Sequence, residues 1–205
     1  AEAMDADQLQ RQADQAMYQA KVSGKNRYHV FDAEHDRSVR GHHENVERMH
    51  QALVDQEFVL HYQPKASLRS GRIVGAEALI RWMHPVHGLV PPDSFIPLAE
   101  ETGMIEGIGI WCLHTACRQI AEWKNIGKSL RVTINISARQ IPEAIPSRLI
   151  AQVCTENGIE PRQLGLEITE STLMDSADTT VEMLRRLQSL GVTLAIDDFG
   201  TGYSS

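Results

Sequence analysis

Residues 164–197 read LGLEITESTLMDSADTTVEMLRRLQSLGVTLAID, and this stretch decides the fold class of the chain. Short apolar runs at Leu164–Thr169 and Val192–Asp197 have the length and composition of buried β-strands. Between them, apolar residues recur at helical spacing and end at a glycine: Val181, Leu184, Leu187 and Leu190, then Gly191. The stretch therefore predicts a strand–helix–strand unit, whose crossover helix makes the two strands parallel.

The same alternation extends back to Phe58. Further strands are expected at Phe58–Gln63, Ile73–Trp82 and Arg131–Ile136, and Gly127 and Gly158 mark the ends of helices. The apolar stripes of these helices are Ile108, Trp111, Cys112, Ala116, Ile120 and Trp123 in one, and Leu149, Ile150, Val153 and Cys154 in the other. Repeated units of this kind form a doubly wound sheet or a TIM-type barrel. No glycine-rich phosphate loop follows any strand, which disfavours dinucleotide-binding and P-loop folds.

The composition is that of a globular protein, with 42% hydrophobic and 23% charged residues among 205. A net charge of -7 argues against binding DNA or RNA through a broad basic surface. No run of apolar residues is long enough to span a bilayer, and the N-terminus lacks a secretory pattern. We therefore expect a cytoplasmic chain, although the parent protein could carry a membrane anchor. The three cysteines, Cys112, Cys117 and Cys154, are predicted to be buried thiols.

Polar side chains interrupt four of the predicted strands near their C-terminal ends. They are Glu77, Asn135, Glu167 and the pair Asp197-Asp198. Because an unpaired buried carboxylate is strongly destabilising, we expect these groups to converge on cations. In TIM-type barrels the active site lies at this same end of the strands.

The donor types favour hard ions. Carboxylate and amide oxygens suit Mg²⁺ or Mn²⁺, whereas zinc sites usually include histidine or cysteine, and neither residue belongs to this set. Two such ions could hold a phosphodiester and activate a water molecule. Arg81, four residues after Glu77, could offer its planar guanidinium to a phosphate. Any one acid alone could instead be a helix cap or an ion-pair partner, and their joint occurrence favours the metal site.

Longer motifs surround these residues. In order, they are Glu77-Ala78-Leu79-Ile80-Arg81-Trp82, Phe95-Ile96-Pro97-Leu98-Ala99-Glu100, Asn135-Ile136-Ser137, Glu167-Ile168-Thr169-Glu170 and Asp197-Asp198-Phe199-Gly200-Thr201-Gly202. Together they resemble the EAL family of cyclic di-GMP phosphodiesterases, from about residue 44 to the last residue. The resemblance implies a TIM-type (β/α)8 barrel that hydrolyses cyclic di-GMP to linear pGpG with Mg²⁺ or Mn²⁺, as a pair of ions.

The resemblance also implies roles for single residues. The implied metal ligands are Glu77, Asn135, Glu167 and Asp197, with Asp198 as a ligand or water-positioning group at the second ion. The implied substrate contacts are Gln63, Arg81 and the backbone around Leu79. Glu170 would anchor the loop from Asp197 to Ser205, which the family associates with the second metal and with homodimer contacts, and it joins Glu77 and Asp198 in the catalytic set.

The N-terminal part divides into two pieces. Residues 1–32 resemble the last helix (residues 7–22) and strand (Asn26–Phe31) of a GGDEF diguanylate cyclase domain. The Gly-Gly-Asp-Glu-Phe loop is absent, so cyclase activity is not carried over. Residues 33–56 are expected to form a linker helix that pairs with a second copy or packs on the next domain, along the stripe Val39, Val46, Met49 and Leu53.

Residues 57–205 are expected to be the N-terminal two-thirds of the EAL domain, since a complete barrel needs about 250 residues. In the family the remaining strands supply a lysine, a glutamate and a glutamine of the site. We therefore expect the chain alone to be incomplete for catalysis, and unstable or self-associating. A cyclic di-GMP receptor without turnover and a regulatory or dimerising fragment are the alternatives. Intact Glu77 and Asp197-Asp198 favour the enzyme.

Overall fold

The computed structural model describes residues 33–137, 140, 147–169 and 178–197, together with the isolated positions 10, 13, 17 and 21. The chain divides into two units, Ala1–Arg48 and Met49–Ser205. In the first unit, the four isolated positions are helical, in agreement with the helix predicted over residues 7–22. The strand predicted at Asn26–Phe31 lies outside the described residues.

The predicted linker helix is present as α2, Ala33–Val54. Its last two turns belong to the second unit, where Met49 and Ala52 are fully buried and Leu53 is half-buried. They pack among aromatic residues of the following elements. The end of the helix is therefore fixed by an apolar contact with the domain that follows it.

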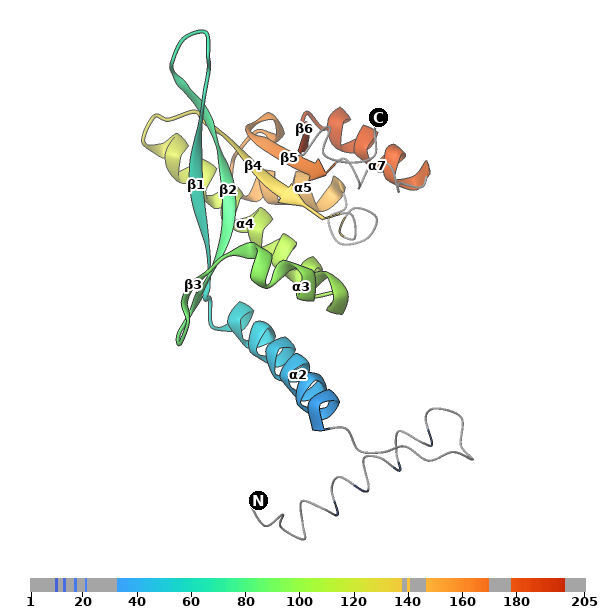
Figure 1. The fold of residues 1–205 in the computed structure, drawn as a ribbon. Helices are drawn as coiled ribbons and strands as arrows, with labels where there is room; N and C mark the ends of the chain where they lie inside the picture. The colour runs from blue at the N-terminus through green and yellow to red at the C-terminus, as the bar shows by residue number, and fades with distance from the viewer. Residues whose placement is uncertain are drawn as a thin grey trace. The chain divides into compact units, whose positions relative to one another are not determined.

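A single mixed sheet organises the second unit (Figure 1). Its strands in sequence are β1 (Phe58–Ala66), β2 (Ile73–His84), β3 (Gly88–Val90), β4 (Arg131–Ile136), β5 (Leu164–Thr169) and β6 (Thr193–Asp197). The spatial order is β1-β2-β4-β5-β6, with β3 paired to β2. The run from β2 through β4 and β5 to β6 is parallel, and helices connect these strands, as the sequence predicts. This arrangement is that of part of a TIM-type barrel.

The first strand pair corrects the prediction of parallel strands throughout. β1 and β2 are antiparallel, with Gln63 opposite Glu77 and Lys65 opposite Gly75. Between them the chain turns back in a tight loop, in which Gly71 has a φ of 67° and donates its N–H to the carbonyl of Ser67 over 2.8 Å. Six residues cannot hold a crossover helix, so the only short connection is a hairpin. The hairpin extends past the other strands in Figure 1.

Helices cover one face of the sheet. The connections contain η1 (Pro92–Ser94), α3 (Ile96–Thr102), α4 (Ile105–Asn125), α5 (Ser147–Glu156), η3 (Pro161–Gln163) and α7 (Asp178–Ser189). Leu113 and Ile120 of α4 pack on Val132 and Ile134 of β4, and all four are buried to 1% exposure or less. Burial of side chains of this size stabilises the fold by about 1.5–3 kcal/mol each.

A second apolar cluster gathers at the start of β1, the end of β2 and α3. Phe58, Trp82 and Phe95 form it, with ring centroids 5.5–5.9 Å apart. The indole N–H of Trp82 donates to Oε2 of Glu57 over 2.8 Å, so the ring is buried without losing its hydrogen bond. β3 and α3, which are not among the elements expected from the sequence, contribute residues to this cluster, and η1 lies between them in the chain.

Strand alternation places the polar residues on the face away from the helices. In β4, Val132, Ile134 and Ile136 belong to the core under the helices, so Thr133 and Asn135 point to the opposite face. The register puts Thr133 level with Glu77 and Gly165, and Asn135 level with Glu167. Residues that are level with each other on neighbouring strands and point to the same face form a layer of side chains. Glu77 thus lies one layer nearer the N-terminal ends of the parallel strands than Asn135 and Glu167 do.

Candidate active site

Three of the predicted site residues lie together on this face. Asn135 donates from Nδ2 to Oε1 of Glu77 over 3.0 Å. The ammonium of Lys65 lies 3.5 Å from Oε2 of Glu77 and also donates to Oε1 of Glu167. β1, β2, β4 and β5 each contribute one of these four side chains. Two carboxylates from non-neighbouring strands therefore converge on one cation.

Lys65 is not among the site residues that the sequence predicts. The signal available was its position two residues after Gln63, which puts both on one face of β1. Burial lowers the pKa of Lys65, but its hydrogen bond to Glu167 and the negative charges of Glu167 and Glu77 outweigh this, so the pKa lies above its ordinary value. Lys65 is consequently charged at neutral pH.

Glu167 is the most enclosed acid of the cluster, at 9% exposure. A carboxylate in such a place needs a partner, and Lys65 provides it. Across the described residues, no buried side-chain nitrogen or oxygen is left without a hydrogen bond. The buried polar atoms of the cluster are therefore all hydrogen-bonded, while its two carboxylates and single ammonium leave it negatively charged.

Asp197 ends β6, opposite Thr169 of β5. It lies two residues beyond Ala195, the residue level with Glu167, and its side chain is exposed. Asp198 and Glu170, the other predicted acids, lie outside the described residues.

Within the described part of the chain, no three histidine, cysteine, aspartate or glutamate side chains are arranged to hold a metal ion. The third donor beside Glu77 and Glu167 is an amide, that of Asn135.

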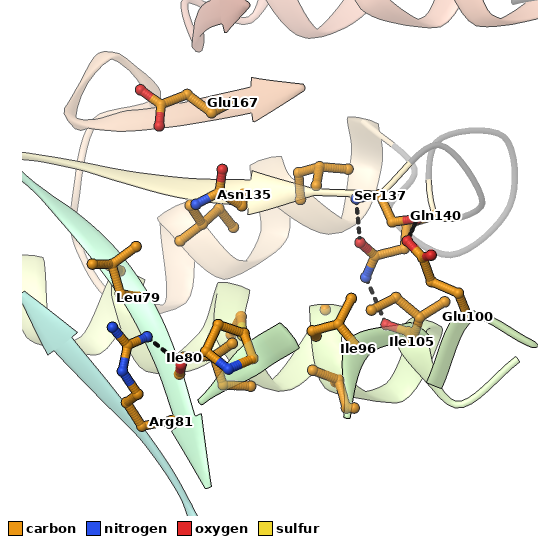
Figure 2. Close-up of a pocket in the computed structure, with 17 residues that line it drawn as sticks. Leu79, Ile80, Arg81, Ile96, Glu100, Ile105, Asn135, Ser137, Gln140 and Glu167 are labelled. Carbon is orange, nitrogen blue, oxygen red and sulfur yellow. Dashed lines mark hydrogen bonds between the residues drawn. The ribbon is translucent and has the colours of Figure 1, made fainter. Parts of the chain in front are cut away.

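The predicted substrate contacts lie beside this cluster. Glu77, Leu79 and Arg81 alternate along β2 and so share one face, and Gln63 stands opposite Glu77 in the hairpin. Leu79 and Arg81 are half-buried, whereas Gln63 is exposed. The guanidinium of Arg81 donates from one Nη to the carbonyl of Ile80 over 2.7 Å (Figure 2). Its other N–H groups can still contact a ligand.

A cavity of about 260 Å³ opens between these strands and helices α3 and α4. Figure 2 shows its polar edge, with Arg81, Asn135 and Glu167 on the strands, and its apolar wall, which includes Ile96 and Ile105. A space with one apolar wall and a few fixed polar groups suits a ligand with a flat apolar part and a charged part.

Hydrogen bonds hold the far wall of the cavity in place. Gln140, at 2% exposure, donates from Nε2 to the carbonyl of Ile105 over 2.6 Å and accepts from the N–H of Ser137 over 2.8 Å. The hydroxyl of Ser137 donates to Oε1 of Glu100 over 2.6 Å. The sequence motifs predict no role for these three residues. Gln140 carries no sequence signal, because only the tertiary structure buries it.

The chain is similar to known proteins over most of its length. Residues 46–205 match the family described as EAL domain. The chain is 42% identical over 199 residues to the bifunctional diguanylate cyclase/cyclic di-GMP phosphodiesterase MucR of Pseudomonas aeruginosa, covering 97% of this chain and 29% of that protein. It is 38% identical over 201 residues to the cyclic di-GMP phosphodiesterase PdeR of Escherichia coli, covering 98% and 30%. The chain thus spans less than a third of the length of these two curated relatives.

Two solved structures also resemble the chain. A complex of the PaMucR phosphodiesterase with c-di-GMP superposes with a TM-score of 0.74 at 44% identity, over 79% of this chain and 66% of that one. The EAL enzyme Bd1971, in a form with cAMP and cyclic-di-GMP bound, gives a TM-score of 0.75 at 30% identity, over 99% and 54%.

Proposed function

Because the chain belongs to the EAL domain family, we propose that it carries the site at which its protein hydrolyses cyclic di-GMP to linear pGpG. One observation carries the proposal: Glu77 and Glu167, from two strands, contact one cation, and Asn135 from a third strand donates to Glu77. Asn135 and Glu167 also line the cavity. The relatives MucR and PdeR are named as cyclic di-GMP phosphodiesterases, which supports the choice of substrate.

We propose Mg²⁺ or Mn²⁺, as two ions, for this site. The donors are all oxygens, and the two described carboxylates already face a positive charge, so the residues fit a hard cation. Glu77, Asn135, Glu167 and Asp197 would hold the ions, and Asp198 would join them at the second one. When bound, the ions supply positive charge to the phosphodiester and lower the pKa of a water molecule.

The protein residues position the reacting groups. The side-chain amide of Asn135 orients Glu77 by donating a hydrogen bond from Nδ2. The Oδ1 atom of Asn135 is then available as a ligand for a metal ion. Arg81 and Gln63, with the backbone at Leu79, would bind the dinucleotide, and the cavity would take one base against its apolar wall. Glu170 would anchor the segment that begins at Asp197, and with Glu77 and Asp198 it completes the proposed catalytic set.

We propose that residues 1–32 are the end of a GGDEF domain, that 33–56 are the linker and that 57–205 belong to the EAL domain. The match to MucR, named as bifunctional, covers 97% of the chain and so includes the N-terminal part, which supports this division. A homodimer through the EAL domain or the linker helix remains part of the proposal. In the described residues no helix is long and apolar enough to cross a membrane, and we propose a cytoplasmic location.

The test is hydrolysis of cyclic di-GMP by the full-length gene product with Mg²⁺ or Mn²⁺, followed by chromatographic detection of pGpG. Wild-type protein should form pGpG, and Glu77→Ala should not. Glu101→Ala, which removes an exposed acid from α3, is the matched control and should keep wild-type activity. Binding of cyclic di-GMP without any pGpG would replace the enzyme with a receptor.

A further inference from the structure

Lys65 reaches the acids from the N-terminal ends of the parallel strands, and it is not among the residues that line the cavity. It pairs with Gly75 at the N-terminal end of β2, one layer below Glu77, whereas Asn135 and Glu167 lie one layer above Glu77. Gly75 has no side chain to stand beside the lysine, and a Cβ there would lie 2.6 Å from the carbonyl oxygen of Arg131. The aliphatic part of the Lys65 side chain therefore runs toward the C-terminal ends of the parallel strands. It passes Gly75, a position where a Cβ atom would not fit.

We propose that Lys65 is a built-in counter-cation of the Glu77–Glu167 pair, which offsets one of the two negative charges before a divalent ion binds and then yields to that ion. This inference rests on the proposed metal site. It concerns a residue to which neither the motifs nor the relatives' names assign a role.

Electrostatics supports the first half of the proposal. Lys65 contacts an oxygen of each carboxylate, and both negative charges come from strands held by the core. Without the ammonium, the carboxylates of Glu77 and Glu167 would repel each other. Because Glu167 is nearly enclosed, its unpaired charge would destabilise the folded state. Lysine thus stabilises the metal-free site.

The side chain also fits the second half. An ammonium is a compact charge on a flexible stem, and the Lys65 side chain is 39% exposed, so it can withdraw toward solvent. A divalent ion would need the same carboxylate oxygens, and it would be repelled by a cation that stayed among them. Removal of the lysine charge should therefore strengthen metal binding while it weakens the metal-free fold. If the ion pair of Lys65 only stabilised the fold, its loss would not increase the affinity of the site for a divalent ion.

The experiment compares wild-type protein with Lys65→Met, which keeps the stem and removes the charge. Lys65→Arg keeps the charge, and Lys128→Met removes a charge from an exposed position after α4. Mn²⁺ affinity is measured by electron paramagnetic resonance of the free ion, and thermal unfolding is measured in excess chelator.

We expect Lys65→Met to bind Mn²⁺ about tenfold more tightly. In chelator it should unfold about 2–4 °C lower than wild type. Lys65→Arg and Lys128→Met should stay close to wild type in both measurements. If wild type binds Mn²⁺ but Lys65→Met binds it no more tightly, or if both unfold at the same temperature in chelator, the inference is overturned and the metal site stands. If wild type binds no Mn²⁺, the metal site itself is overturned, and the inference with it.

Discussion

Asn135 donates a hydrogen bond to Glu77 across 3.0 Å, although the two residues are 58 positions apart in the sequence. The bond joins β4 to β2 diagonally, because the register places Thr133, not Asn135, level with Glu77. Asn135 therefore sets the orientation of a carboxylate in the layer below its own.

Asn135→Asp should damage the site while the fold survives. The change replaces a donor with a carboxylate that repels Glu77, so hydrolysis of cyclic di-GMP should fall about 10- to 100-fold. The metal-free protein should lose about 1 kcal/mol of unfolding free energy, measured by urea denaturation in chelator. Asn125→Asp, at the exposed end of α4, is the matched control and should keep full activity. Equal activity of the two variants would contradict the proposed role of Asn135.

Arg81→Lys should weaken substrate binding more than it affects stability. Arg81 already donates to the carbonyl of Ile80, and its remaining N–H groups form a fork that lysine cannot reproduce. The dissociation constant for cyclic di-GMP should rise about tenfold or more, as measured by calorimetry. Arg72→Lys, on the exposed hairpin, makes the same exchange away from the cavity and should bind normally. Tight binding by Arg81→Lys would show that the fork does not contact the phosphate.

Gly165→Ala should destabilise the sheet under the site. A Cβ at this position would lie 2.8 Å from Oγ1 of Thr133, the neighbour that shares its layer on β4. We expect a loss of about 1–3 kcal/mol in unfolding free energy, since two packed strands must move apart. Gly107→Ala in α4 is the control: its Cβ would meet only Cδ1 of Leu53 at 3.5 Å, an ordinary contact. That variant should gain about 0.5–1 kcal/mol from the lower backbone entropy of alanine.

Tyr62 should make the fold sensitive to alkali. Burial raises the pKa of Tyr62 to about 12, and the negative charge of Glu122 acts in the same direction. The Tyr62 ring packs edge-on against Trp123, with 5.1 Å between the ring centroids. The folded pKa is above that of an unfolded tyrosine, about 10, so the unfolded state loses its proton first. The contribution of Tyr62 to stability is therefore complete below pH 10 and is lost as the pH rises through 12.

The test measures urea unfolding of wild type and Tyr62→Phe between pH 9 and pH 12. Phenylalanine keeps the ring and removes the ionisable hydroxyl, so the variant should lose less stability over this interval. Identical pH profiles would show that Tyr62 does not ionise differently in the folded and unfolded chains.

The sequence patterns located most of the sheet. β4 and β5 begin and end at the predicted residues, and β6 begins one residue later, at Thr193. Apolar periodicity suffices there because each strand is covered by a helix on one face. Apolar runs do not predict the antiparallel start of the sheet, because an apolar run does not reveal the direction of its partner strand. Only the length of the 67–72 connection excludes a crossover helix.

The candidate site was predicted in part for the same reason. Glu77, Asn135 and Glu167 stand out in sequence because they interrupt apolar strands, and they lie together in the structure. Their roles as metal ligands stay predictions. Lys65 does not stand out, because a lysine near the end of a strand is common. Its contact with Glu167, 102 residues away, depends on the register of three strand pairs and on the absence of a side chain at Gly75.

The alternation of faces along β2 sets a rule for changes in chain length. Glu77 belongs to the site, whereas Ala76 and Ala78 on either side of it are buried. One residue inserted between Gly75 and Glu77 would turn the carboxylate into the helix-covered core and bring an alanine to the site, while two inserted residues would restore the order. Insertions in the 67–72 loop carry no such penalty. Homologous sequences should therefore differ freely in length at the hairpin tip, and within β2 only by even numbers of residues.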